Sequence, residues 1–314
     1  MKRSGMLCVM ILFGAVITLL LPQLAISAEE KQPTPAPTLP TEGDRKKEAE
    51  ELRRLRDVYL RSLSVFIRRG EVIFELNTFY STDRRQDFLQ LTPTDATLIR
   101  TTRRFFDTTV FLRLGLATGL EFDVIVPAFV HAEQEIDLGT GRNRAVSEGL
   151  GDIGAALRYQ VWYEQGGWPA LIIDAIGKSR TGGDSLRGTG SYHVGGGITL
   201  LKSIDPVVFF GRIGYTETLE LNGRNLGNIF DYSLGMGFSL NDRVSFNMQV
   251  TNSLIGQTTL LGQKIEGSSL EIVNLLFTTT VLVTKKLFIE PVVGVGVTDD
   301  AFDAILGFRV PYRF

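Results

Sequence analysis

The chain has 314 residues, including 33 glycines and a single cysteine, and its formal net charge is −2 at pH 7. This charge balance lacks the basic excess that nucleic-acid binding leaves in a composition, so we expect no nucleic-acid partner. One cysteine, Cys8, excludes a disulfide framework and a thiolate metal centre.

Residues 1–27 have the pattern of a secretory signal peptide. Lys2 and Arg3 precede an apolar run from Met6 to Leu21, and small residues around Ser27 fit a cleavage site. A permanent membrane anchor is the alternative, because the apolar run is long. After residue 28 no stretch approaches the roughly 18 consecutive apolar residues of a membrane helix. If the mature chain lies in a membrane, strands must place it there.

Two short segments follow the predicted signal peptide. Residues 28–43 contain four prolines among small and polar residues, which predicts an extended linker. Residues 44–70 predict an amphipathic helix that ends at Gly70, because apolar side chains recur at helical spacing. This stripe comprises Leu52, Leu55, Tyr59, Leu63 and Phe66. It needs a partner, which could be a second copy, a barrel interior or a periplasmic protein.

From residue 71 to residue 314 the hydrophobic period changes to two. In residues 302–314 large apolar side chains alternate with polar residues or glycine, so that one face of a strand is apolar and the other polar. We count about twelve such segments, an even number as bacterial barrels usually have. They are residues 71–82, 98–116, 120–132, 150–164, 169–179, 190–202, 206–217, 229–240, 243–253, 269–283, 287–297 and 302–314. The fold class is therefore predicted to be all-β, a transmembrane antiparallel β-barrel preceded by a short periplasmic helix.

The connections between these segments alternate in length. Short ones, such as Asn241-Asp242, alternate with longer polar ones, such as Glu133 to Gly149. Short periplasmic turns and long outer loops are typical of outer-membrane barrels. A soluble antiparallel sandwich is the competing interpretation, and it would point the apolar face inward. The polar face is too rich in charge and glycine for solvent-exposed surface, which favours the barrel.

The polar face of the strands carries charges of both signs. The predicted interior residues are Asp107, Arg113, Glu121, Asp123, Asp152, Arg158, Gln160, Arg212, Asp231, Asn247, Gln249, Glu290, Asp303, Arg309 and Arg313. They could form a salt-bridge network that stiffens the barrel, line a conducting path, or do both. Twelve strands would leave room for a narrow channel or one inserted helix. By the same alternation His131 and His193 are predicted to face the interior.

No catalytic or cofactor motif stands in a suitable context. The spacing of Gly149-Leu-Gly-Asp-Ile-Gly154 matches a dinucleotide fingerprint, but it leads into an alternating strand instead of a helix. The two histidines have no further metal ligands at matched spacing, and His193 has no orienting partner for nucleophilic catalysis. We predict no cofactor, no metal site and no enzymatic activity.

Residues 71–314 resemble the outer-membrane barrels grouped as the MetA-pathway of phenol degradation family. The resemblance rests on Gly149-Leu-Gly-Asp-Ile-Gly-Ala-Ala-Leu-Arg-Tyr159, on Tyr232-Ser-Leu-Gly-Met-Gly-Phe-Ser-Leu240 with the following Asn-Asp-Arg-Val-Ser-Phe-Asn, and on the terminal Arg-Phe. The resemblance implies that small, often aromatic, molecules pass through the barrel. It does not identify any residue of this chain as a substrate contact. The predicted helix ahead of the barrel is similar instead to the arrangement in amyloid-export barrels.

Together these patterns favour a passive channel for small solutes, hydrophobic or aromatic ones included, in the outer membrane of a Gram-negative bacterium. An export or assembly barrel with a helical plug and a closed structural barrel are the alternatives. Expected partners are membrane lipid, the solute, and a periplasmic protein or second copy at the 44–70 helix. We also expect the barrel-assembly machinery to read the last strand through Val310, Tyr312 and Phe314.

Overall fold

The computed structural model describes residues 67–92, 95–138, 141–183 and 186–314. The predicted signal peptide, linker and helical stripe from Leu52 to Phe66 lie outside these residues. Within the described ranges, no helix is long and apolar enough to cross a membrane.

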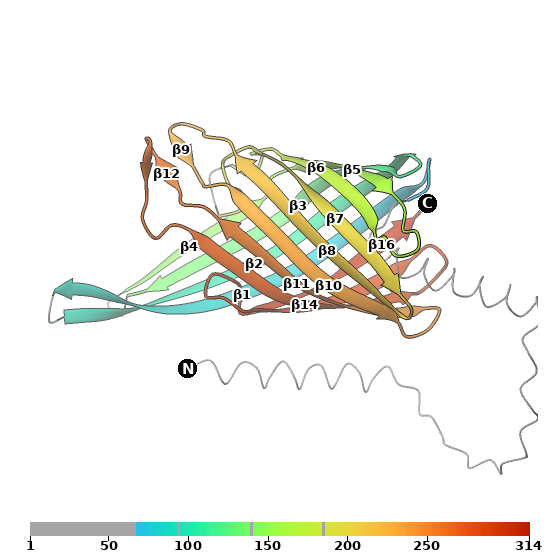
Figure 1. The fold of residues 1–314 in the computed structure, drawn as a ribbon. Helices are drawn as coiled ribbons and strands as arrows, with labels where there is room; N and C mark the ends of the chain where they lie inside the picture. The colour runs from blue at the N-terminus through green and yellow to red at the C-terminus, as the bar shows by residue number, and fades with distance from the viewer. Residues whose placement is uncertain (1–66, 93–94, 139–140, 184–185) are drawn as a thin grey trace, which may run out of the picture. The chain divides into compact units, whose positions relative to one another are not determined.

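In the described part of the chain, twelve antiparallel strands form a closed barrel (Figure 1). Each barrel strand pairs with the next along the chain, and the last pairs with the first from Ile73↔Arg313 to Thr82↔Ala304. The strands are β1 (Val72–Thr92), β2 (Asp95–Ala117), β3 (Leu120–Asp137), β5 (Gly154–Trp162), β6 (Ala170–Lys178), β7 (His193–Ile204), β8 (Val207–Thr218), β10 (Ile229–Ser239), β11 (Val244–Ile255), β14 (Leu270–Leu282), β15 (Phe288–Gly296) and β16 (Ala304–Arg313). The predicted all-β barrel is confirmed.

Four shorter strands lie at the end of the barrel where the connections are long, which we call the loop end. The other end, with the tight connections, is the short-turn end. β4 (Arg142–Gly149) continues the sheet beside the last part of β3. The remaining strands, β9 (Arg224–Asn225), β12 (Thr259–Leu260) and β13 (Gln263–Lys264), form a separate small sheet from two loops.

The hairpin of β1 and β2 projects well beyond the other strands at the loop end (Figure 1). β1 leaves β16 after Thr82 but remains paired with β2 as far as Thr92↔Asp95. The sequence-based boundaries, which ended the first strand at residue 82 and made Glu133 to Gly149 a loop, are wrong here. In this extension ion pairs such as Arg104–Glu133 at 2.9 Å replace the apolar residues of a half-buried strand. The apolar–polar alternation that predicts strands is therefore absent from this extension.

The barrel is apolar outside and polar inside. In the β10–β11 hairpin Leu234 pairs with Val250 on the exterior face, and Leu234 is 66% exposed. The buried side chains include many charged ones, with Glu121 and Asp123 among the least exposed. In water each such exposed aliphatic side chain would forgo roughly 1.5–3 kcal/mol of burial energy. This arrangement is the inverse of a soluble sandwich.

A β-bulge in β3 reverses the side-chain alternation. The β2–β3 register shifts where Thr108 and Thr109 face Phe129 and Pro127, so Ala128 is an extra residue. Beyond the bulge His131 lies on the same face as Phe129, which is 42% exposed, whereas Val130 is 2% exposed. The prediction that His131 faces the interior is therefore wrong. Its Nδ1 lies 2.7 Å from Glu148 Oε1 on β4.

Candidate functional site: the barrel interior

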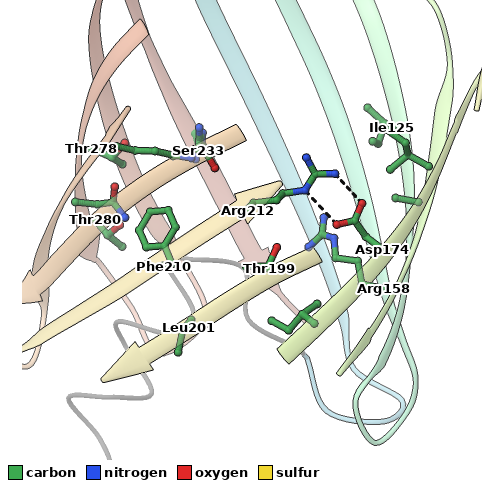
Figure 2. A pocket seen from close by; sticks show the side chains of 16 residues that line it. Ile125, Arg158, Asp174, Thr199, Leu201, Phe210, Arg212, Ser233, Thr278 and Thr280 are labelled. Atoms are coloured by element: carbon green, nitrogen blue, oxygen red, sulfur yellow. Dashed lines mark hydrogen bonds and ion pairs between the residues drawn. The ribbon is translucent and has the colours of Figure 1, made fainter. Parts of the chain in front are cut away.

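An ion pair spans two strand spacings inside the barrel. Arg212 on β8 donates to Asp174 on β6, with Nε–Oδ1 at 3.1 Å and Nη2–Oδ2 at 2.8 Å (Figure 2). Gly197 on the intervening strand β7 makes room, since a Cβ there would lie 2.5 Å from Arg212 Nη2. The third nitrogen of Arg212 donates to Asp231 on β10. One guanidinium thus joins three strands, β6, β8 and β10, and passes over a fourth, β7.

A second network lies toward the short-turn end. Arg158 on β5 donates to Glu121, with Nη1–Oε1 at 3.1 Å, and to Asp123. Both carboxylates are almost fully buried, with side-chain exposures of 1% and 0%. Nearby, Arg113 Nη2 lies 3.0 Å from Glu75 Oε2. A buried carboxylate without such partners would be strongly unfavourable, which explains why each one is paired.

These networks border a cavity of about 370 Å³ in the barrel interior (Figure 2). One part of its lining is apolar and consists of Ile125, Ala156, Ile172, Ile176, Leu201 and Phe210. Another part is uncharged and polar and consists of Ser233, Asn247, Gln249, Thr278 and Thr280. The charged lining residues are Arg158, Asp174, Arg212 and Arg309. Figure 2 shows Phe210, Thr278 and Thr280 on the side of the cavity away from Asp174 and Ile125.

Glycines let large side chains lie flat against the inner wall. A Cβ at Gly235 would lie 2.2 Å from Cζ of Phe210, and one at Gly307 would lie 2.3 Å from Cδ1 of Phe79. The guanidinium carbon of Arg309 is 5.8 Å from the centre of the Phe79 ring. The interior space is kept open because these rings cover glycines instead of pointing to the barrel axis.

The chain enters the barrel wall beside the second network. The Ile67 N–H donates to Glu121 Oε2 at 3.3 Å, and Ile67 is 9% exposed. The Gly70 N–H donates to the Gly115 carbonyl at 2.8 Å. A Cβ at Gly115 would lie 2.1 Å from the Arg68 carbonyl oxygen, so this approach requires glycine. The last residues before β1 are therefore fixed to the interior of the short-turn end.

At the loop end, Asp152 holds the connection between β6 and β7. Its carboxylate accepts hydrogen bonds from the Gly182 and Thr189 N–H groups, both at 2.9 Å, and from Lys178 Nζ at 3.0 Å. Burial raises the pKa of Asp152, but these hydrogen bonds and the charge of Lys178 outweigh it and the net pKa lies below its usual value. The ionised carboxylate therefore stabilises this loop.

The predicted interior residues occupy three kinds of position. Those that line the cavity are Arg158, Arg212, Asn247, Gln249 and Arg309. Those in ion pairs or hydrogen bonds along the wall are Asp107, Arg113, Glu121, Asp123, Asp231, Glu290 and Arg313, and Gln160 is buried there at 8% exposure. At the loop end lie Asp152 and Asp303, the latter accepting from the Arg84 N–H at 3.0 Å.

Sequence reasoning missed three carboxylates on the inner face of the sheet, Glu75 and Asp174 in the barrel and Asp83 where β1 begins to project beyond it. Asp83 is 2% exposed, and its carboxylate lies 2.6 Å from Arg103 and 3.2 Å from Arg85. Asp174 stands alone in an otherwise apolar segment, and that isolation was the available signal. A lone carboxylate in a half-buried strand requires a cationic partner, which Arg212 supplies.

The last strand exposes its aromatic side chains. Phe314 is 65% exposed, its N–H donates to the Val72 carbonyl at 3.0 Å, and its ring packs edge-on against Tyr312 with centroids 5.0 Å apart. No group of three or more histidine, cysteine or carboxylate side chains suited to a metal ion occurs among the residues that the structure describes.

No family model matches the chain, so its resemblance to the phenol-degradation family stays a prediction. Among solved structures, an outer membrane channel from Pseudomonas putida F1 is similar with a TM-score of 0.56 and 11% identity, over 79% of this chain and 97% of that one. The NanC porin has a TM-score of 0.44 and 9% identity, over 76% of this chain and 98% of that one. Only the first likeness bears on the fold, and it supports the closed barrel.

Proposed function

We propose that this chain is a passive outer-membrane channel for small solutes, hydrophobic and aromatic molecules among them. The observation that carries the proposal is the amphipathic cavity of about 370 Å³ inside a closed barrel whose exterior is apolar. A closed barrel satisfies every backbone hydrogen bond between strands, so it can stand in lipid. Its polar interior then offers the solute a path that the bilayer does not.

The outer membrane of a Gram-negative bacterium is the matching location, since transmembrane barrels of this kind occur there. The Pseudomonas putida protein of similar fold is described as an outer membrane channel, and we extend that description to this chain. The resemblance to the phenol-degradation barrels gives the solute class, and we propose no enzymatic activity. In this proposal the short-turn end faces the periplasm.

The proposed organisation assigns a role to each end of the chain. The signal peptide (1–27) directs export, the linker (28–43) spans to the periplasmic helix (44–70), and the helix plugs or docks at the barrel (71–314). The contact between Ile67 and Glu121 supports plugging, because it brings the chain to the interior just before β1. Val310, Tyr312 and Phe314 on the last strand are the proposed contacts of the barrel-assembly machinery.

Planar-bilayer recording of the refolded mature chain, beginning at residue 28, tests the proposal. Discrete conductance steps from a protein that shows heat-dependent gel mobility are the expected result. A folded, heat-modifiable barrel that is silent at every voltage would show a closed structural barrel instead.

A further inference from the structure

Arg309 differs from the other arginines that line the cavity. Arg158 and Arg212 are each shared between two carboxylates. Among the described residues, Arg309 makes no hydrogen bond or close ion pair, and its guanidinium carbon lies 5.8 Å from the centre of the Phe79 ring. Arg309 stands opposite Glu290 in the β15–β16 register, and its charge acts on that carboxylate. Glu290 is 3% exposed and its Oε1 accepts from Thr280 Oγ1 at 3.0 Å, and the side chains of Glu290 and Arg309 form no direct ion pair. The N–H groups of Arg309 are therefore available to a solute.

Two of the carboxylates bound by the cavity arginines, Asp174 and Asp123, are covered, whereas Asp231 is as exposed as Arg212, at 25% against 26%. Side-chain exposure is 7% for Asp174 and 0% for Asp123, against 26% for both Arg212 and Arg158. Asp174 and Asp123 are thus occupied by arginine and lie behind it, and Asp231 is not among the residues that line the cavity. A solute in the cavity meets mainly hydrogen-bond donors where it meets charge.

The remaining lining divides the cavity into an apolar side and a hydrogen-bonding side. Ile172, Leu201 and Phe210 contribute to the apolar side, and Thr278 and Thr280 on β14 contribute hydroxyl groups. Arg309 on β16 is two strands away from these threonines, across β15. A volume of about 370 Å³ falls at the small end of ligand pockets, which span roughly 300–1,000 Å³.

We propose that this cavity binds small organic acids with an apolar body, and that Arg309 is the residue that selects their carboxylate. The guanidinium plane of arginine matches a carboxylate in two parallel hydrogen bonds. The Thr278 hydroxyl supplies a further donor, whereas the Thr280 hydroxyl already donates to Glu290. The apolar side removes the body of the solute from water. The inference rests on the proposed channel function and names the class of solute that the cavity retains.

Three probes of one size separate the contributions of charge and shape. Benzoate, benzyl alcohol and benzylamine share a ring but carry an anionic, neutral and cationic head. We expect benzoate to block single-channel current through the full mature chain at concentrations roughly tenfold or more below those of the other two. A charge-assisted hydrogen bond of about 1.5–3 kcal/mol gives a ratio of that size. Equal block by all three probes would overturn the proposal.

Matched variants assign the effect to Arg309. Arg309→Gln should weaken benzoate block about tenfold and leave benzyl alcohol unchanged, and Arg309→Lys should fall between wild type and Arg309→Gln because it keeps charge without the bidentate fork. Arg243→Gln is the control, because Arg243 lies in the exposed turn between β10 and β11. Wild-type block by benzoate in Arg309→Gln would contradict the assignment.

Calorimetric titration of benzoate into the same detergent-folded proteins keeps this inference distinct from the channel function. Conductance without selective benzoate block or binding overturns the solute class alone. A silent barrel that still binds benzoate through Arg309 overturns conduction and supports the binding site. A silent barrel that binds none of the probes overturns both.

Discussion

Arg212 and Asp174 are joined by two hydrogen bonds, at 3.1 Å and 2.8 Å, that pass over the strand between them. The crossing is possible because Gly197 presents no side chain on the inner face of β7. Glycine at position 197 therefore keeps the interior wide, because it lets the Arg212 side chain lie flat against the wall and leave the barrel axis open.

Gly197→Ala should displace Arg212 from Asp174. The added methyl group would lie 2.5 Å from Arg212 Nη2, and overpacking of this kind costs about 1–3 kcal/mol. We expect a lower urea midpoint for unfolding from lipid vesicles and a changed conductance. Gly177→Ala on β6 is the control, because nothing lies within 4 Å of a Cβ at that position. Equal midpoints for the two variants would show that the crossing contributes nothing to stability.

Arg158→Gln should be among the most damaging substitutions of the interior. It leaves Glu121 and Asp123, at 1% and 0% exposure, without their shared guanidinium. Breaking a buried ion pair by removing one partner costs about 3–5 kcal/mol. Vesicle-embedded protein should unfold at a markedly lower urea concentration. Adding Glu121→Gln and Asp123→Asn to the same chain should recover much of the loss, and failure to recover would mean that Arg158 acts by packing.

The loop between β6 and β7 should loosen in acid. Because the pKa of Asp152 in the folded barrel lies below its ordinary value of 3.8, its stabilisation is complete above about pH 3.8. The stabilisation is lost as pH falls through the folded pKa. Hydrogen exchange at the Gly182 and Thr189 amides, which donate to this carboxylate, should therefore accelerate in that range.

Asp152→Asn should accelerate the same exchange already at neutral pH, because it removes the charge that Lys178 faces at 3.0 Å. Asp242→Asn in the exposed β10–β11 turn provides the comparison. If the Asp152 variant retains wild-type protection at pH 7, the hydrogen bonds hold the loop without the charge.

The segment before β1 should influence conduction. Removing residues 28–70 deletes Ile67, whose N–H donates to Glu121 inside the short-turn end. We expect the chain that starts at residue 71 to conduct more than the chain that starts at residue 28 in the same bilayers. Equal conductance would assign the predicted helix a docking role outside the barrel.

The alternation of apolar and polar residues predicted the barrel because lipid and the polar interior impose opposite demands on the two faces of every strand. That signal disappears in the projecting β1–β4 sheet, where Arg104 and Glu133 form ion pairs on one face and Asp83 and Arg103 on the other. The face of the sheet on which His131 lies could not be predicted from the sequence. One bulge residue, Ala128, reverses the inward–outward alternation of the side chains that follow it.

The interior charges could be predicted as a set but not as pairs. Arg212 and Asp174 are 38 residues apart and are separated by a strand, so their contact follows from register and from the missing side chain at Gly197. Neither the register between strands nor the effect of Gly197 can be predicted from the apolar–polar alternation within a single strand.

The most direct test of the channel proposal compares cysteines placed on the two faces of one strand. A chain expressed from residue 28 lacks Cys8, so Ser233→Cys, at the cavity, or Leu234→Cys, on the exterior, would be its single thiol. A charged thiol reagent should lower single-channel conductance at position 233 and leave it unchanged at position 234. Unchanged conductance after complete modification of position 233 would contradict a path through the barrel interior.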